Sequence, residues 1–138
     1  MNVDACFNPN GKGAVGAILR NEKGDAVAGG CWPLSNVLDA ATAEATTLQR
    51  GLALIEHLGY PPVIIETDSY NGVIKVWSPF TSILIDCFVR SSRHGAIKVQ
   101  HCNWGANLVA HNLARHAFDS NSSISWDCDP LVLLCQMY

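Results

Sequence analysis

Val63-Ile64-Ile65-Glu66-Thr67-Asp68, near the middle of the chain, combines a short apolar run with two acids. An unbroken run of this length is typical of a strand buried on both faces of a sheet. The acids are unexpected beside it, because a carboxylate in apolar surroundings is costly unless a partner compensates it. The stretch therefore predicts a strand of an α/β sheet with a polar site at its carboxyl end.

Three strands and a long helix are predicted before this stretch. Apolar runs between short, glycine-bearing turns indicate strands at 1–8, 14–20 and 26–32, joined as an antiparallel meander. Apolar residues then recur at three- and four-residue steps, which predicts a helix that ends near Gly59. The residues that carry this period are Leu38, Ala41, Ala45, Leu48, Leu52 and Ile55.

The order of elements predicts a five-stranded mixed sheet flanked by helices. After the central strand we expect a short helix capped by Ser69 and running to Trp77, and a second helix after Pro79. The remaining elements are a strand at 97–101, a helix at 106–118, a polar linker at 119–125 and an apolar tail at 131–138 that packs as a last short helix. We expect one domain over 1–118, with the segment 119–138 packed on it.

Composition limits the class of protein and of partner. A chain of 138 residues with 49% hydrophobic and 15% charged residues is long enough for one globular domain. The net charge of -3 argues against indiscriminate nucleic-acid binding, but leaves open a local basic strip with bridging metal ions. No apolar stretch reaches the roughly 20 residues that span a membrane, so we expect no membrane partner.

The six cysteines form no C-x-x-C pair, which argues against a structural zinc site. Their irregular spacing indicates reduced thiols in an intracellular protein, of the nucleus or the cytoplasm. Gly11-Lys12-Gly13-Ala14-Val15-Gly16 matches the dinucleotide fingerprint, but the following apolar segment is too short for the helix that this motif requires.

Asp4, Glu44 and Asp68 are candidates for a shared cation site, since each lies in an apolar context in a different element. Taken alone, Glu44 is equally a boundary residue whose tip reaches water, and Asp68 a helix cap. Taken together, the acids lie where the first and fourth strands flank the point at which strand order reverses. Magnesium prefers such oxygen ligands, and two ions about 3.5–4 Å apart cleave phosphodiesters.

Four sequence blocks resemble the signature of the ribonuclease H superfamily, and most closely the plant reverse transcriptase-like RNase H domains also found in retroelements. The blocks are Asn2-Val3-Asp4-Ala5, Ala43-Glu44-Ala45, Glu66-Thr67-Asp68-Ser69 and Asn107-Leu108-Val109-Ala110-His111-Asn112-Leu113-Ala114. The resemblance covers residues 1–118 and implies a sheet of strand order 3-2-1-4-5.

By this resemblance, Asp4, Glu44, Asp68 and His111 bind two Mg²⁺ or Mn²⁺ ions, and His101 is a mobile catalytic histidine. The alternative for His101 is a strand-end histidine bonded to the backbone. The resemblance further implies substrate-side roles for Asn8, Ser69 and Asn107, with Asn107 also bracing the last helix.

The resemblance implies metal-dependent cleavage of the RNA strand in an RNA–DNA hybrid. The alternative is a weak or inactive domain that binds nucleic acid or protein, because imidazole at position 111 suits magnesium less well than oxygen. A basic strip of Arg90, Arg93, His94 and Lys98 is either a nucleic-acid contact or a solvated helix end. The apolar tail is a candidate surface for a protein partner.

Overall fold

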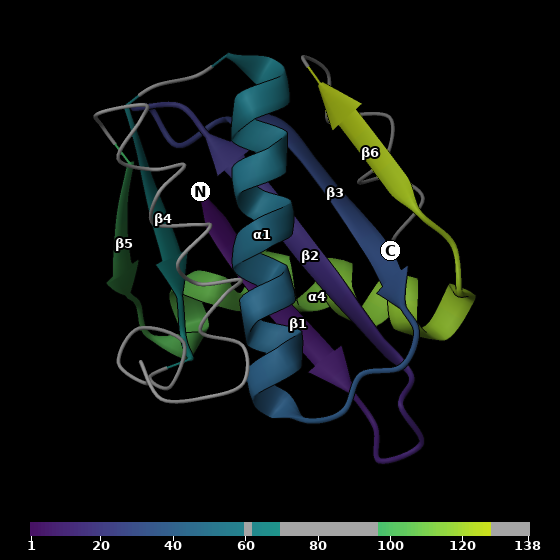
Figure 1. Ribbon diagram of the computed structural model, residues 1–138. Helices are drawn as coiled ribbons and strands as arrows, with labels where there is room; N and C mark the ends of the chain where they lie inside the picture. The colour runs from purple at the N-terminus through teal and green to yellow at the C-terminus, as the bar shows by residue number, and fades with distance from the viewer. Residues whose placement is uncertain (60–61, 70–96, 128–138) are drawn as a thin grey trace.

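A mixed β-sheet lies between two helices in the computed structural model, which describes residues 1–59, 62–69 and 97–127 (Figure 1). The sheet order is β5-β4-β1-β2-β3-β6. The elements are β1 (Asn2–Phe7), β2 (Gly13–Arg20), β3 (Ala26–Leu34), α1 (Ala40–Leu58), β4 (Val63–Thr67), β5 (Ile97–His101), α4 (Trp104–Ser120) and β6 (Ile124–Asp127). Neither helix in these ranges is long and apolar enough to cross a membrane.

The predicted α/β class and the strand order 3-2-1-4-5 are confirmed. Strands β1, β2 and β3 form the antiparallel meander, while β4 pairs in parallel with β1 and β5 in parallel with β4. The helices predicted after Ser69 and after Pro79, and the tail at 131–138, lie outside the described residues.

A sixth strand, β6, corrects the prediction of a polar linker at 119–125. Helix α4 continues to Ser120, and β6 begins at Ile124 and pairs antiparallel with β3. Ile124 and Trp126 are partly buried against the core on the α4 side, whereas Ser125 and Asp127 are exposed. This alternation of apolar and polar residues is the period of a half-buried strand.

Helix α1 begins at Ala40, so Leu38, the first residue of the predicted apolar pattern, is not part of the helix. Asp39 caps the helix, because its side chain accepts a hydrogen bond of 2.7 Å from the backbone N–H of Thr42. Leu38 therefore lies outside the helix and is 81% exposed, and Ala41 also faces solvent. The buried face of the helix is Ala43, Ala45, Thr47, Leu48, Gly51, Leu52 and Ile55.

The two helices cover opposite faces of the sheet (Figure 1), and small residues let both come close. On the α1 face, a Cβ at Gly51 would lie 3.0 Å from a methyl group of Val3 in β1. On the α4 face, a Cβ at Gly16 of β2 would lie 2.3 Å from the carbonyl oxygen of Ala110. The backbone of α4 thus rests almost directly on β2, beside Asp4, which pairs with Gly16 across the sheet.

We expect Gly16→Ala to destabilise the protein by about 1–3 kcal/mol, because the added methyl group would overlap the backbone of α4. Thermal unfolding measures the loss. Gly105→Ala is the matched control on α4, since a Cβ there meets its nearest atom at an ordinary 3.4 Å. An unchanged melting temperature for Gly16→Ala would contradict the close packing.

Candidate functional site

Asp4 and Asp68 lie side by side at the place where β4 ends beside β1. Asn2 pairs with Glu66 in the parallel register, so two residues farther along each chain bring Asp4 next to Asp68. Asp4 is only 5% exposed. Burial raises the pKa of Asp4, and the charge of Asp68 raises it further, whereas a hydrogen bond with His111 opposes both effects.

His111 of α4 is the direct partner of Asp4. Its Nδ1 lies 2.8 Å from Oδ2 of Asp4, and its side chain is 38% exposed. When Asp4 is ionised, Nδ1–H donates this hydrogen bond, which leaves Nε2 as the nitrogen that can bind a ligand. At position 111 the histidine therefore donates a hydrogen bond to Asp4, whereas an acid at this position would add a further negative charge beside it.

Asn107 fixes α4 to both acid-bearing strands. Its Nδ2 donates to the carbonyl oxygen of Val3 at 2.9 Å and to Oδ1 of Asp68 at 3.0 Å. Because both partners are acceptors, the amide nitrogen must point at them. The side chain is fully buried, and its Oδ1 has no hydrogen-bond partner within the described part of the chain. Asn107 thereby holds Asp68 against β1.

Glu44 brings a third carboxyl from α1, on the opposite side of the sheet from α4. Burial raises the pKa of Glu44 to about 7, and the charges of Asp4 and Asp68 raise it in the same direction. A hydrogen bond with the side chain of Ser69 partly opposes these effects. Three elements thus place three carboxyls close enough for the charges of Asp4 and Asp68 to disfavour the ionised form of Glu44.

This donor set has the chemistry of a site for a hard cation, which would relieve the repulsion among the carboxylates. The three carboxyl groups are, however, too far apart to act as ligands of one metal ion as they stand in this structure. Among residues 1–59, 62–69 and 97–127, no three His, Cys, Asp or Glu side chains gather as closely as ligands of one metal ion. Asp4 and Asp68 instead direct one oxygen each to His111 and Asn107.

The sequence profile of the reverse transcriptase-like family matches residues 2–117. The chain belongs to this family. Solved structures of RNase H1 proteins share the fold of this reverse transcriptase-like domain, so the chain has an RNase H-like fold. No curated protein sequence matches the chain.

Three similar structures illustrate the shared fold. RNase H1 from Halobacterium salinarum is 23% identical, with a TM-score of 0.71 over 86% of this chain and 96% of that one. LC11-RNase H1, solved in complex with an RNA/DNA hybrid, is 20% identical, with a TM-score of 0.77 over 87% and 96%. The N-terminal RNase H domain of a Mycobacterium tuberculosis protein is 22% identical, with a TM-score of 0.71 over 86% and 91%.

The other predicted site residues of this reverse transcriptase-like domain lie around the carboxyls or beyond them. His101 is exposed at the end of β5. Asn8 lies in the β1–β2 turn, where its Oδ1 accepts from the backbone N–H groups of Asn10 and Lys12, both at 3.1 Å. The backbone N–H of Ser69 donates to Oγ1 of Thr67. The catalytic and substrate roles of these residues remain predictions.

Glu66 has a structural role in the domain that the sequence did not reveal. Its two carboxyl oxygens accept hydrogen bonds from Gln100 at 2.9 Å and from Asn2 at 3.2 Å. These bonds tie β4 to its neighbours β5 and β1. Of the two acids in the central stretch, Glu66 therefore holds the sheet together and Asp68 faces the candidate site.

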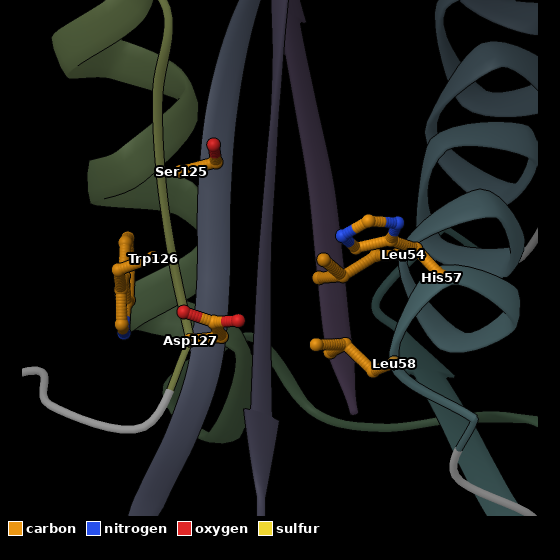
Figure 2. Close-up of a pocket in the computed structure, with 6 residues that line it drawn as sticks. All are labelled: Leu54, His57, Leu58, Ser125, Trp126 and Asp127. Carbon is orange, nitrogen blue, oxygen red and sulfur yellow. The ribbon is translucent and has the colours of Figure 1, made fainter.

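A pocket of about 220 Å³ lies elsewhere, between the second half of α1 and β6 (Figure 2). Its lining is Leu54, His57, Leu58, Ser125, Trp126 and Asp127. Leu54 is ten residues beyond Glu44 on the same helix, a separation of about 15 Å along the axis. The pocket is therefore separate from the carboxyl cluster.

We expect Glu44 to make the folded domain less stable as the pH rises. Its pKa is raised from 4.5 to about 7 on folding, so its stabilising effect is complete below about 4.5 and lost as the pH passes through about 7. The change is at most on the order of 3 kcal/mol, since water screens this partly exposed group.

Urea unfolding at a series of pH values, with a chelator present, tests this expectation. In the wild type, the free energy of unfolding should fall between about pH 4.5 and about pH 7, and Glu44→Gln should make this fall smaller. Glu22→Gln, which removes an exposed acid from the β2–β3 turn, should retain it. Parallel profiles for the wild type and Glu44→Gln would show that Glu44 does not titrate as proposed.

Proposed function

We propose that this domain hydrolyses the RNA strand of RNA–DNA hybrids, with divalent cations held by Asp4, Glu44 and Asp68. The observation that carries the proposal is the convergence of three acids: Asp4 of β1 lies beside Asp68 at the end of β4, and both are close enough to Glu44 of α1 for their charges to raise its pKa. Carboxyls from β1, α1 and the end of β4 therefore act as one electrostatic unit. The similarity to LC11-RNase H1, which was solved with an RNA/DNA hybrid, supports this choice of substrate.

Different residues of the chain would have different roles in the reaction. Two bound Mg²⁺ or Mn²⁺ ions would supply an activated water and stabilise the leaving oxygen. Glu44 must lose its proton to become a ligand, and a neighbouring cation lowers its pKa and favours that loss. Asn107 keeps one oxygen of Asp68 engaged, so that the other oxygen points away from the amide. His101 would protonate the leaving group or aid product release.

Cleavage of a labelled RNA strand tests the proposal directly. With Mg²⁺ or Mn²⁺, we expect the wild type to cut the RNA in a hybrid but not in an RNA–RNA duplex. Asp68→Asn should lower the rate by at least about a hundredfold, because it weakens the hold on the cations that stabilise the negatively charged transition state. Glu22→Gln removes an equal charge from the exposed β2–β3 turn and should cleave like the wild type.

A second candidate function, a nucleic-acid-binding module with weak or no catalysis, is favoured by the pair of His111 and Asp4. That hydrogen bond of 2.8 Å engages a carboxylate oxygen that a cation would otherwise bind. A folded wild type that binds the hybrid and leaves its RNA intact with either metal would support this function and overturn the first.

We expect His111→Asp to strengthen metal binding, because it frees Oδ2 of Asp4 and adds an oxygen ligand. Without metal, the additional charge should lower the melting temperature. Mg²⁺ at about 100 times its Kd should then stabilise the variant by about 2.7 kcal/mol. The variant should reach this stabilisation at a lower Mg²⁺ concentration than the wild type does. Thermal unfolding across a Mg²⁺ titration measures both effects. A variant that needs more Mg²⁺ than the wild type would contradict the role given to His111.

A further inference from the structure

We propose that the exposed face of α4 binds a single-stranded extension of the nucleic acid held at the carboxyl site. In this proposal Trp104 stacks on an unpaired base, and Lys12 and Arg115 hold phosphates at the other end of the helix. The inference rests on the proposed function for the location of the nucleic acid. It adds a substrate class, namely hybrids that continue into a single strand.

One continuous stripe of side chains runs along α4 through the site. Its members are spaced by four, three, four and three residues, which places them on one helix face. They are Trp104, Leu108, His111, Arg115 and Phe118. The stripe extends over about 21 Å at 1.5 Å per residue. Because His111 is in the middle of it and bonds to Asp4, the stripe is continuous with the carboxyl site.

Trp104 is the most unusual member of the stripe. It is 58% exposed, although tryptophan is highly buried on average. Its ring lies 6.2 Å from that of His111, at an interplanar angle of 63°. Leu108, the next residue along the stripe, is also exposed. An exposed indole beside the proposed carboxyl site offers a stacking surface for a base, whichever base it is.

Cations surround the other end of the stripe. Nζ of Lys12, in the β1–β2 turn, lies 4.6 Å from the ring centre of Phe118, and Cζ of Arg115 lies 5.7 Å from it. Arg115 also donates from Nε to Asp119 at 3.1 Å, and its side chain is 63% exposed. The ring brings two positive charges together, that of the exposed Arg115 and that of the partly exposed Lys12, in a chain whose net charge is -3.

This combination fits a single strand better than a duplex or an apolar protein partner. Bases within a duplex are already stacked on one another and hide their faces, whereas unpaired bases expose them. An apolar partner would have no use for paired cations beside the aromatic ring. Aromatic faces together with backbone-tracking positive charge are the usual elements of single-strand binding.

Binding of labelled hybrids tests the role of Trp104, with Ca²⁺ in place of Mg²⁺ to keep the RNA intact. One hybrid has blunt ends, one carries an RNA overhang and one a DNA overhang. The wild type should bind an overhang hybrid more tightly than the blunt one. Trp104→Ala should weaken overhang binding about fivefold to a hundredfold and leave blunt binding unchanged. Trp104→Phe should retain most of the affinity, and Trp104→Leu should not.

Charge variants test the other end of the stripe. The double variant Lys12→Gln with Arg115→Gln should reduce the salt slope of overhang binding by about 2. The matched control is Arg20→Gln with Lys23→Gln, which removes two exposed cations from the region of the β2–β3 turn and should keep the wild-type slope. Asp119→Asn should tighten binding, because it releases Arg115 and removes a negative charge.

The two proposals fail in different ways. Equal affinity for blunt and overhang hybrids, or a Trp104→Ala variant that binds both as the wild type does, overturns the inference even if the wild type cleaves RNA. Selective overhang binding without cleavage by the wild type overturns the proposed function and leaves the inference standing. A wild type that binds none of the three hybrids overturns both.

Discussion

The close contact between α4 and the sheet at Gly16 is the constraint on which the site depends. A side chain at this position would displace α4, since the carbonyl of Ala110 is only 2.3 Å from where a Cβ would be. The contact brings His111 within 2.8 Å of Asp4, the residue that pairs with Gly16. Because Gly16 of β2 has no side chain, His111 of α4 can approach Asp4 of β1 to this distance.

The carboxyl cluster combines contributions from both faces of the sheet, and this explains its electrostatics. Asp4 lies on the central strand, Asp68 follows the end of the neighbouring strand, and Glu44 comes from α1. The pKa of Glu44 is raised to about 7, mainly by burial and further by the charges of Asp4 and Asp68. The folded domain therefore stores an unfavourable interaction that a bound cation would relieve, as expected at a functional site.

Apolar patterns predicted the strands at 63–67 and 97–101, because they report on which faces are buried. The order of the first five strands was implied by the resemblance to the ribonuclease H superfamily. The sequence did not predict β6, because the polar residues around Ile124 suggested a linker. The resemblance placed His111 and Asp4 in one site, but it did not predict their direct hydrogen bond, because the two residues are 107 positions apart and local patterns carry no information on such a contact. The exposure of Trp104 was missed for the same reason, since it depends on tertiary packing.

The central claim is that Asp4, Glu44 and Asp68 form one cation site. Paramagnetic broadening of backbone NMR signals by substoichiometric Mn²⁺ tests it most directly, because broadening falls steeply with distance from the ion. The account predicts that the signals of residues 3–5, Glu44 and Asp68 broaden first, and that excess Mg²⁺ restores them. Early broadening at Asp127 or in the β2–β3 turn, with these signals intact, would contradict it.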